Sequence, residues 1–328
     1  CYRCPLGLKY PSCGVKCADD IKELILSTTT GKVAGFLAEP IQGVGGFVVP
    51  PPEYFAKAVA IVREHGGVFI CDEVQTGFGR TGKHWFGIQH WGVEPDIMTM
   101  AKGVANGMPL AVCIATPEIA DSFKKSQIST FGGNPLSCAA ANATLEVIEE
   151  EHLARNAEVQ GERLMEGLRK LQKRHPKNIG DVRGKGLMAG VEIVVDELHG
   201  DRTPNPQLVG KVFEETKKRL LLIGKGGMYG NVFRIAPALN VTADEIDEAL
   251  VKLGESFAAQ DEATEDGFCP GAFGPGGAFG FLDGRSVIPP RSGGVRASRG
   301  RGPASMTDAF RPGRRRFRSQ CSKIQAEI

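Results

Sequence analysis

The sequence has 328 residues, of which 41% are hydrophobic and 24% are charged, a composition typical of a globular protein with a sizeable core. It contains no apolar stretch long enough to span a bilayer, which argues against a helical membrane protein. Of its 40 basic and 38 acidic residues, 11 and 7 lie in residues 261–328. Residues 1–260 are therefore slightly acidic and give no electrostatic reason to expect binding to nucleic acid.

Residues 1–116 predict alternating helices and strands. An amphipathic helix is expected at 19–27, and a helix that begins with the prolines at 50–52 is expected to end at Gly66-Gly67. Short apolar runs predict buried strands at 32–38, 68–71, 96–101 and 109–115. This order is typical of the parallel sheet of an α/β fold, which we expect to continue through residue 116.

The second half predicts longer helices and antiparallel strands. We expect helices from Pro135 onward and at 153–174, 206–219 and 242–257, with strands at 180–195 (strand–turn–strand), 220–223 and 232–235. Thr242 and Glu245 form a capping box before the last helix. The chain is therefore divided into two expected domains, residues 1–143 and a smaller α+β domain at 144–260.

Residues 261–328 have a different composition. They contain 12 glycines and 6 prolines and show no helical or strand periodicity, so a disordered tail is predicted. Arginine- and glycine-rich tails can bind RNA. Alternatively, residues 261–328 are a foreign or misread extension that does not belong to the protein.

Four cysteines lie near the start of the chain. Cys1, Cys4, Cys13 and Cys17 have the spacing C-x2-C-x8-C-x3-C, which a zinc site could use. No zinc-ribbon pattern surrounds them, so zinc is kept only as an alternative, and no metal site is predicted. A disulfide framework is disfavoured for an enzyme of intracellular character.

Two of the predicted strands end on groups of opposite charge. The strand at 68–71 is followed by Asp72, and the strand at 96–101 is followed by Lys102. Ligands of open α/β sheets bind beyond the carboxyl ends of the strands. The pair suits pyridoxal phosphate, because a lysine can hold this cofactor as a Schiff base while a carboxylate keeps its pyridine nitrogen protonated. Taken alone, the pair is better explained as a turn-capping Asp72 and an exposed Lys102.

Longer motifs around these residues change that balance. Residues 69–82 (FICDEVQTGFGRTG) and 99–103 (TMAKG) resemble the signature of the class III, or ω-amino acid, aminotransferases. Residues 38–43 (AEPIQG) and 130–135 (TFGGNP) match further motifs in the family's order. Within the family, residues 180–188 and 233–237 are most similar to the branch that uses alanine and glyoxylate. The resemblance covers roughly residues 1–258 and implies fold type I of the pyridoxal phosphate enzymes, here part of the large mixed or parallel-sheet domain and the smaller α+β domain.

The resemblance implies roles for five residues of a cofactor site. Lys102 would form the Schiff base and then move the proton at the substrate carbon, and Asp72 would pair with the pyridine nitrogen. Val74 would pack on the ring face, and Gln75 would bond the ring hydroxyl. Thr130 would reach the cofactor phosphate of a neighbouring subunit, which implies a homodimer with shared active sites.

Glu39 and Arg234 match the positions that bind substrate in the family. The planar fork of an arginine binds a carboxylate through two parallel hydrogen bonds. Family members let this arginine bind the carboxylate near the amine, or pair with the glutamate when that carboxylate is absent. A purely structural salt bridge between Glu39 and Arg234 is the alternative.

The expected activity is therefore pyridoxal 5′-phosphate-dependent transamination, from alanine or an ω-amino acid to glyoxylate or pyruvate. The expected compartment is the cytoplasm, or the mitochondrial matrix if the source is a eukaryote. Acetylornithine and 4-aminobutyrate transaminases and related phospho-lyases remain alternatives. A non-catalytic zinc- or RNA-binding protein is the alternative of another class.

Two parts of the family's cofactor site have no counterpart in the sequence. These are the glycine- and serine-containing phosphate loop and the aromatic residue that stacks on the ring. The resemblance implies that both precede Cys1, so we expect an N-terminally truncated fragment that binds the cofactor poorly by itself.

Overall fold

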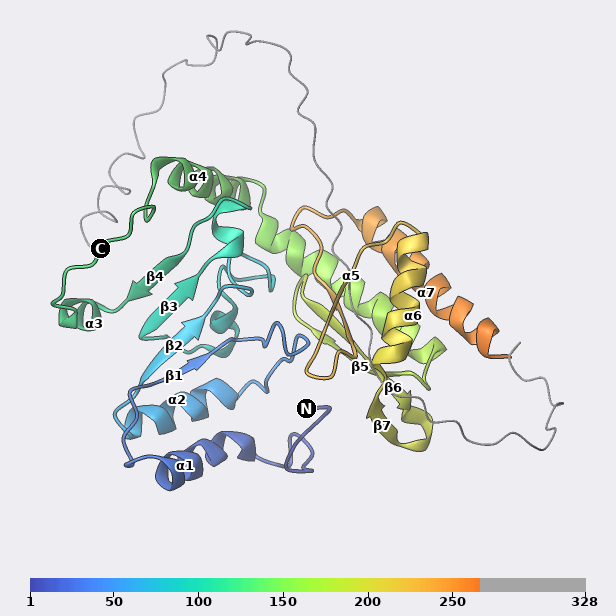
Figure 1. The fold of residues 1–328 in the computed structure, drawn as a ribbon, viewed down its shortest axis with the longest axis horizontal. Helices are drawn as coiled ribbons and strands as arrows, with labels where there is room; N and C mark the ends of the chain where they lie inside the picture. Colours follow the sequence, from blue (N-terminus) through green and yellow to red (C-terminus); the bar gives the residue numbers. More distant parts are fainter. Residues whose placement is uncertain (266–328) are drawn as a thin grey trace, which may run out of the picture. The chain divides into compact units, whose positions relative to one another are not determined.

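The computed structural model describes residues 1–265, whose helices and strands are labelled in Figure 1. All of them belong to one compact unit that contains two sheets. The last helix, α7 (Ala243–Glu265), runs beyond its predicted end at 257 and includes the first five residues of the predicted tail. The rest of that tail, residues 266–328, lies outside the described part, and the predicted division at residue 143 stays a prediction. No helix within residues 1–265 has the length and apolar content needed to cross a membrane.

The first sheet contains the strands that precede Asp72 and Lys102. Its order is β1 (Gly35–Ala38), β2 (Val68–Asp72), β3 (Ile97–Met100) and β4 (Val112–Ala115). β1, β2 and β3 are parallel, whereas β4 is antiparallel to β3. The expectation of a parallel sheet through residue 116 is therefore wrong for the last strand. Only the short 3-10 helix η2 (Lys102–Ala105) and a turn separate β3 from β4, and a parallel neighbour needs a longer crossover.

Helix α2 (Tyr54–Glu64) packs against β1 and β2, and α1 (Lys16–Thr28) packs on α2. The apolar residues of α2 recur at helical spacing, so that one face buries Phe55, Val59 and Val62. The Phe55 ring lies 5.7 Å from the Phe69 ring of β2, measured between centroids. This aromatic contact belongs to the core that holds β2, and so the Asp72 end of the strand, in place.

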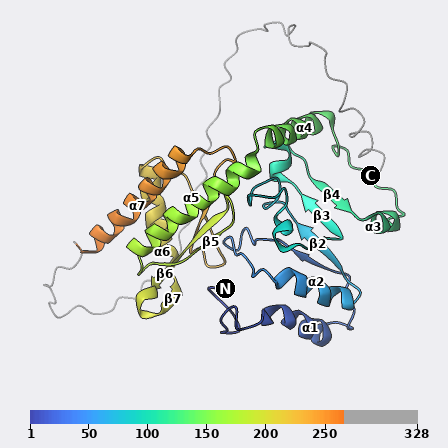
Figure 2. The same ribbon diagram turned by 180° about the vertical axis from the view of Figure 1, so that it is seen from behind.

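The second sheet is antiparallel, with the order β5 (Ile179–Gly184), β6 (Ala189–Asp196), β9 (Val232–Ile235) and β8 (Gly224–Gly226); β7 (Asp201–Pro204) also pairs with β6. Helices α5 (Leu153–Arg174), α6 (Pro206–Lys218) and α7 pack with it, as the reverse view in Figure 2 shows. Their core includes Leu164, Leu168, Val191, Phe233 and Leu253.

Two details of the second sheet differ from the prediction. Residues 220–223 do not form the predicted strand, because Leu220 turns the chain with a left-handed φ of 58° after α6, and β8 starts at Gly224. Leu220 and Leu222 are 86% and 82% exposed, so this apolar run does not mark a buried element. Strand β7 was not predicted, because its sequence Asp-Arg-Thr-Pro lacks apolar alternation.

Helix α4 (Pro135–Glu150) connects the part of the chain with the first sheet to α5. It begins where predicted, because the Asn134 side chain accepts a hydrogen bond from the Ser137 N–H at 2.9 Å and Pro135 occupies the first helical position. A short helix, α3 (Pro117–Ser122), precedes it, and the short 3-10 helices η1 (Gly87–Trp91) and η3 (Glu197–His199) lie in other connections.

The loop after β2 touches the turn between β5 and β6 through backbone atoms. A Cβ added to Gly186 would lie 2.3 Å from the carbonyl carbon of Thr81, and one added to Gly82 would lie 2.8 Å from the Cα of Glu158 in α5. Both glycines also have positive φ angles, of 55° and 73°. We call this contact between residues 79–82 and 184–187 the glycine seam.

Arg80 adds hydrogen bonds to the glycine seam. Its Nη1 donates to the carbonyl oxygens of Leu187 at 3.3 Å and Pro237 at 2.5 Å, and the Leu187 N–H donates to the Arg80 carbonyl at 3.1 Å. The chain leaving β2 is thereby fixed against the second sheet.

Candidate active site

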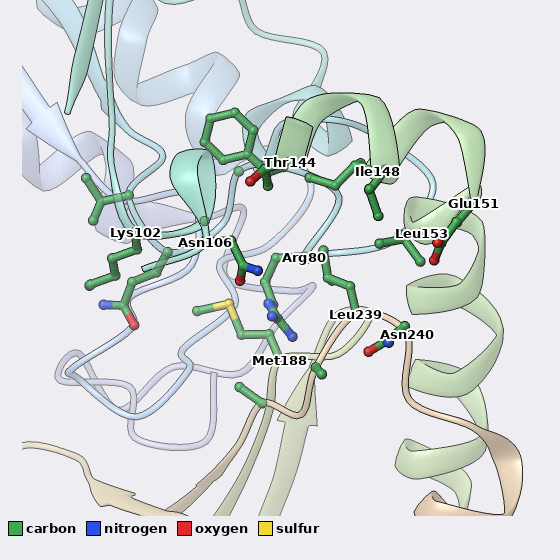
Figure 3. Close-up of a pocket in the computed structure, with 18 of the residues that line it drawn as sticks. Arg80, Lys102, Asn106, Thr144, Ile148, Glu151, Leu153, Met188, Leu239 and Asn240 are labelled. Atoms are coloured by element: carbon green, nitrogen blue, oxygen red, sulfur yellow. The ribbon is translucent and has the colours of Figure 1, made fainter. Parts of the chain in front are cut away.

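A cavity of about 620 Å³ lies beside the glycine seam. Lys102 from η2, Val74 and Gln75 from the loop after β2, and Arg234 from β9 all line it. Figure 3 shows Lys102 at one end of this cavity and Glu151 and Asn240 toward the other, with Arg80 between them. Four of the predicted site residues therefore share one space, although they come from distant parts of the sequence.

Lys102 follows β3 directly and has a φ of 46°, in the left-handed region that a lysine rarely adopts. Its side chain is exposed, and it forms no hydrogen bond or ion pair with any other described residue. Residues held in such a conformation cluster at functional sites, at a cost of about 1–3 kcal/mol. A free amine on a strained turn at the edge of a cavity agrees with a chemical role for Lys102.

Asp72 is the last residue of β2 and pairs with Thr99 of β3. Thr99 precedes Lys102 by three residues. The Asp72 Oδ1 accepts a hydrogen bond from the Val74 N–H at 3.0 Å, so it caps the turn, as the simpler interpretation expected. Its Oδ2 has no hydrogen-bond partner among residues 1–260. Asp72 is half-buried and is not one of the residues that line the cavity.

Arg234 lies where β9 pairs with Gly190 of β6 and Gly224 of β8. Its Nη2 donates to the Gln75 Oε1 at 3.3 Å, and its guanidinium carbon lies 4.9 Å from the centre of the Phe47 ring. Its Nε is buried and has no hydrogen-bond partner. A desolvated donor without a partner is costly, so this guanidinium is suited to receive an anionic ligand.

Glu39 does not form the predicted pair with Arg234 in the described part of the chain. Its Oε2 instead accepts a hydrogen bond from the Gly43 N–H at 2.8 Å. A Cβ on Gly43 would lie 2.1 Å from the Gln75 Nε2, so the amide of Gln75 rests against this glycine. Glu39 therefore reaches Arg234 only indirectly, through Gly43 and Gln75, and the alternative of a structural salt bridge is wrong.

Thr130 lies outside the cavity, in an exposed turn before α4. The apolar residues around it are also exposed: Ile128 by 93%, Phe131 by 81% and Leu136 by 68%. The structure therefore does not bring Thr130 together with Lys102 within one chain.

Glu73, beside Asp72, has a structural position. It is fully buried and accepts hydrogen bonds from the Thr76 hydroxyl and from the N–H groups of Gly87 and Ile88, at 2.5, 2.9 and 2.8 Å. Burial raises the pKa of this carboxyl, and the hydrogen bonds act in the opposite direction. Glu73 thus ties the loop after β2 to η1 and does not face the cavity.

Phe47 and Arg80 are among the residues of the cavity wall to which sequence reasoning gave no role. Arg80 stands in the motif at 69–82, and burial without a carboxylate partner lowers the pKa of its guanidinium. Phe47 follows Gly46 in an apolar stretch and carries no chemical signal of its own. Its left-handed φ of 55° is visible only in the structure.

The cysteines near the start of the chain are free. Among the residues described, no group of three or more histidine, cysteine or acidic side chains is arranged to hold a metal ion. The spacing of Cys1, Cys4, Cys13 and Cys17 therefore gains no support from geometry.

Residues 7–257, well over half of the chain, match the aminotransferase class-III family. The chain belongs to the class III aminotransferases. The mitochondrial alanine–glyoxylate aminotransferase 2 homolog 2 of Arabidopsis thaliana is 48% identical over 73% of the chain and 49% of that relative. This class III chain therefore spans about half the length of that relative.

Other class III comparisons support the same fold and family. A leucine/methionine racemase of Thermococcus litoralis is 40% identical over 80% of the chain and 58% of the relative. The crystal structure of a Bacillus anthracis aminotransferase superposes with a TM-score of 0.73 at 35% identity, covering 79% of this chain and 60% of that one. The fold is that of the type I enzymes, which confirms the predicted fold class.

Class III aminotransferases depend on pyridoxal 5′-phosphate, and the residues around the cavity fit it. The wall carries an amine, two guanidinium groups and the Gln75 amide, against a single carboxylate, Glu151. Such a set favours an anionic ligand, and the partnerless Nε of Arg234 indicates the same. The residues that would hold pyridoxal phosphate are Lys102, Val74 and Gln75, together with Asp72 through its unpaired oxygen.

Proposed function

We propose that the protein transfers an amino group from alanine or an ω-amino acid to glyoxylate or pyruvate. The observation that supports this most is the shared cavity, in which the Lys102 amine and the Arg234 guanidinium line one space. A proton carrier and a carboxylate receptor are the two groups that amino acid chemistry needs together. The alanine–glyoxylate aminotransferase relative supports this choice of substrates.

The cofactor and four residues would divide the work. When bound, pyridoxal phosphate supplies an electron-accepting ring that stabilises negative charge on the substrate carbon. Lys102 would hold the cofactor through its Nζ and, once released, move a proton at that carbon. The carboxylate of Asp72 would keep the pyridine nitrogen protonated. Val74 would pack on the ring face, and Gln75 would bond the ring hydroxyl.

Arg234 would receive the substrate carboxylate nearest the amine, and Glu39 would become its partner when that carboxylate is absent. Glu39 is bonded to the Gly43 N–H, so this exchange requires it to break that bond first. Because Gln75 lies against Gly43, movement of the Glu39–Gly43 loop would also release the Gln75–Arg234 bond. Movement of this single loop could therefore bring about the proposed exchange, in which Arg234 binds either the substrate carboxylate or Glu39.

We also propose a homodimer in which Thr130 contacts the cofactor phosphate held by the partner subunit. Its place in an exposed turn outside its own cavity supports this role, as do the exposed apolar side chains of Ile128, Phe131 and Leu136. For location we propose the cytoplasm, or the mitochondrial matrix in a eukaryote. The name of the Arabidopsis relative specifies mitochondria.

The central test is the Lys102→Ala substitution in the full-length protein supplied with pyridoxal phosphate. Alanine–glyoxylate transamination should fall by at least about 10²-fold, the range for loss of a proton-transferring group. Lys83→Ala is the matched control, because Lys83 is also exposed and left-handed at φ 61° but does not line the cavity. Equal losses in the two variants, or none in either, would contradict the role of Lys102.

The same assay separates the substrate alternatives. Faster turnover of acetylornithine or 4-aminobutyrate than of alanine and β-alanine would move the protein to those transaminases. Release of phosphate from a phosphorylated amine would indicate a phospho-lyase. An expressed 1–328 chain that binds pyridoxal phosphate tightly would contradict the expectation that this segment alone is impaired.

Amino acid racemisation is a second candidate, favoured by the likeness to the leucine/methionine racemase. It needs the same proton carrier but no keto acid acceptor. Incubation of single enantiomers of leucine or alanine without keto acid, followed by chiral chromatography, distinguishes it from transamination.

A further inference from the structure

The guanidinium of Arg234 is held with few polar contacts. Its only hydrogen bond to a described residue is the 3.3 Å bond to Gln75, and its Nε is buried without a partner. No carboxylate among the side chains described, those of residues 1–260, lies within ion-pair distance of it. Hydrogen bonding alone therefore does not fix the plane of this fork.

Aromatic and backbone packing supply what hydrogen bonds do not. The guanidinium carbon lies 4.9 Å from the centre of the Phe47 ring, within the range of a cation–π contact. Farther back along the same side chain, a Cβ on Gly226 would lie 2.5 Å from the Arg234 Cδ. The arginine side chain therefore runs closely past Gly226 to reach the ring.

Phe47 occupies an unusual backbone position for an aromatic residue. Its φ is 55°, in the left-handed region, and only 2% of its surface is exposed. Such a conformation persists only where the surroundings impose it. Gln42 and Val48, which flank the loop, exchange two backbone hydrogen bonds of 3.1 and 3.2 Å.

The second sheet holds the same loop from outside. The Arg183 Nε donates to the Gly46 carbonyl at 2.9 Å, and the Gly227 N–H donates to the Val44 carbonyl at 3.0 Å. Gly190 of β6 leaves space at this point, since a Cβ there would lie 2.8 Å from the Gly46 carbonyl oxygen and 3.4 Å from the Phe47 Cβ. The backbone around Phe47 is thus fixed on both flanks.

We infer that Phe47 is a positioning residue that presents the Arg234 fork to the substrate carboxylate, and so determines specificity for carboxylate-bearing substrates. This inference rests on the carboxylate-binding role proposed for Arg234. The buried ring attracts the cation and limits where its guanidinium can lie, while it uses none of the N–H donors that would bind the ligand. Phe47 acts through Arg234 and makes no bond to the reacting atoms.

The test uses the full-length protein loaded with pyridoxal phosphate and the Phe47→Leu variant. We expect KM for alanine and for pyruvate to rise by about tenfold, the factor of a partly desolvated cation–π contact. The single-turnover rate of the half-reaction with 1-phenylethylamine, a donor without a carboxylate, should stay within about twofold when no keto acid is present, because that half-reaction does not use the guanidinium of Arg234. Calorimetry with propanoate as the probe should show a parallel loss of affinity for a simple carboxylate.

A second variant reaches the same geometry without changing the ring. Gly226→Ala places a methyl group against the Arg234 Cδ and should displace the side chain from Phe47. It should reproduce the selective loss for carboxylates even if Phe47→Leu fails to fold. Phe213→Leu is the matched control, because its ring also contacts cations, Lys225 at 4.5 Å and Lys217 at 4.9 Å, but lies outside the cavity wall.

The outcomes separate this inference from the function on which it rests. If Arg234→Ala raises KM for carboxylates but Phe47→Leu and Gly226→Ala do not, the role of Phe47 is wrong and that of Arg234 stands. If Arg234→Ala has no effect on carboxylate binding, the proposed substrate site itself is wrong. Equal losses with alanine and 1-phenylethylamine in Phe47→Leu would mean that Phe47 only supports the fold.

Discussion

At the scale of single residues, the cavity differs from a simple pairing of opposite charges. Arg234 donates to the neutral Gln75, while Glu39 accepts from a backbone N–H. Neither charge neutralises the other, so the cation remains available to a ligand and the carboxylate is stabilised by a charge-assisted bond. In the proposed function, a substrate carboxylate would therefore reach Arg234 without first breaking a strong ion pair, whose separation in a buried site is costly.

The first prediction concerns Arg234→Ala. It should weaken the half-reaction with α-keto acids by about 10- to 100-fold, the cost of losing a charged hydrogen-bonding group. Cofactor affinity should change little, because Gln75, Val74 and Lys102 remain. Single-turnover kinetics and the absorbance of bound cofactor measure the two effects separately. Equal weakening of both would contradict the substrate role.

The second prediction concerns pH and His90. Burial, followed by the charges of Lys185 and His84, lowers the pKa of His90 to about 4. The folded state keeps this ring neutral, so its contribution to stability is complete above pH 6.5 and is lost as the pH falls toward 4. The free energy of unfolding in urea should therefore change less between pH 6.5 and pH 4 in His90→Gln than in the wild type. We expect the difference to be about 1 kcal/mol, because His90 is partly exposed and solvent screens its charge.

Parallel slopes of stability against pH in the wild type and His90→Gln would contradict this second prediction. His199→Gln is a suitable control, because His199 is an exposed histidine whose ring bonds Asp196 at the surface.

At the scale of elements, the glycine seam makes the third prediction. Gly186→Ala would add a methyl group 2.3 Å from the Thr81 carbonyl carbon, at a φ of 55°. Because the contact is with backbone, we expect a loss of about 3 kcal/mol or more in the free energy of unfolding. Gly200→Ala is the control, with a φ of 80° and open space around the new atom, and should cost only about 1 kcal/mol.

Denaturant unfolding of the two variants separates the cost of the close backbone contact from the cost of the left-handed conformation. Similar losses for Gly186→Ala and Gly200→Ala would mean that only the left-handed conformation matters and that the close approach can relax. A larger loss for Gly186→Ala would locate the extra cost in the backbone contact.

The sequence predicted most elements because their signals are local. Apolar runs marked β2 and β3, and Pro135 after Asn134 marked the start of α4. The direction of β4 was not predictable from its own residues, because it depends on how little chain separates it from β3. The strand predicted at 220–223 is wrong because its surroundings also decide its conformation. Leu220 is left-handed in the turn after α6, and this turn outweighs the strand propensity of the apolar run.

The same distinction holds for the site. The family motifs identified Lys102, Gln75 and Arg234, which line one cavity. Motifs find such residues because the proposed chemistry depends on their side-chain type. They did not reveal Phe47, whose position depends on a left-handed φ and on contacts with a distant sheet. They also suggested a direct Glu39–Arg234 pair, whereas the Gly43 N–H, only four residues from Glu39, offers a closer donor.

At the scale of the whole molecule, the fourth prediction tests whether active sites are shared. Lys102→Ala and Thr130→Ala subunits should each be inactive or weak as homodimers. Mixed dimers place an intact Lys102 of one subunit beside the intact Thr130 of the other, and should regain up to about half of the activity per dimer. The measurement is transamination after the two variants are unfolded and refolded together.

A double variant, Lys102→Ala with Thr130→Ala, supplies the control for this mixing experiment. Refolded with either single variant, it leaves no site with both residues intact and should restore nothing. Full activity of Thr130→Ala by itself would contradict the phosphate-binding role.

The glycine seam also has a consequence for engineering the enzyme. Where backbone rests on backbone, no layer of side chains can slide or compress, so the walls bearing Lys102 and Arg234 keep a constant separation. To fit a bulkier amine into the proposed site, lining side chains such as Val147 and Leu239 are therefore better targets than the glycine seam, because loosening the seam would cost stability.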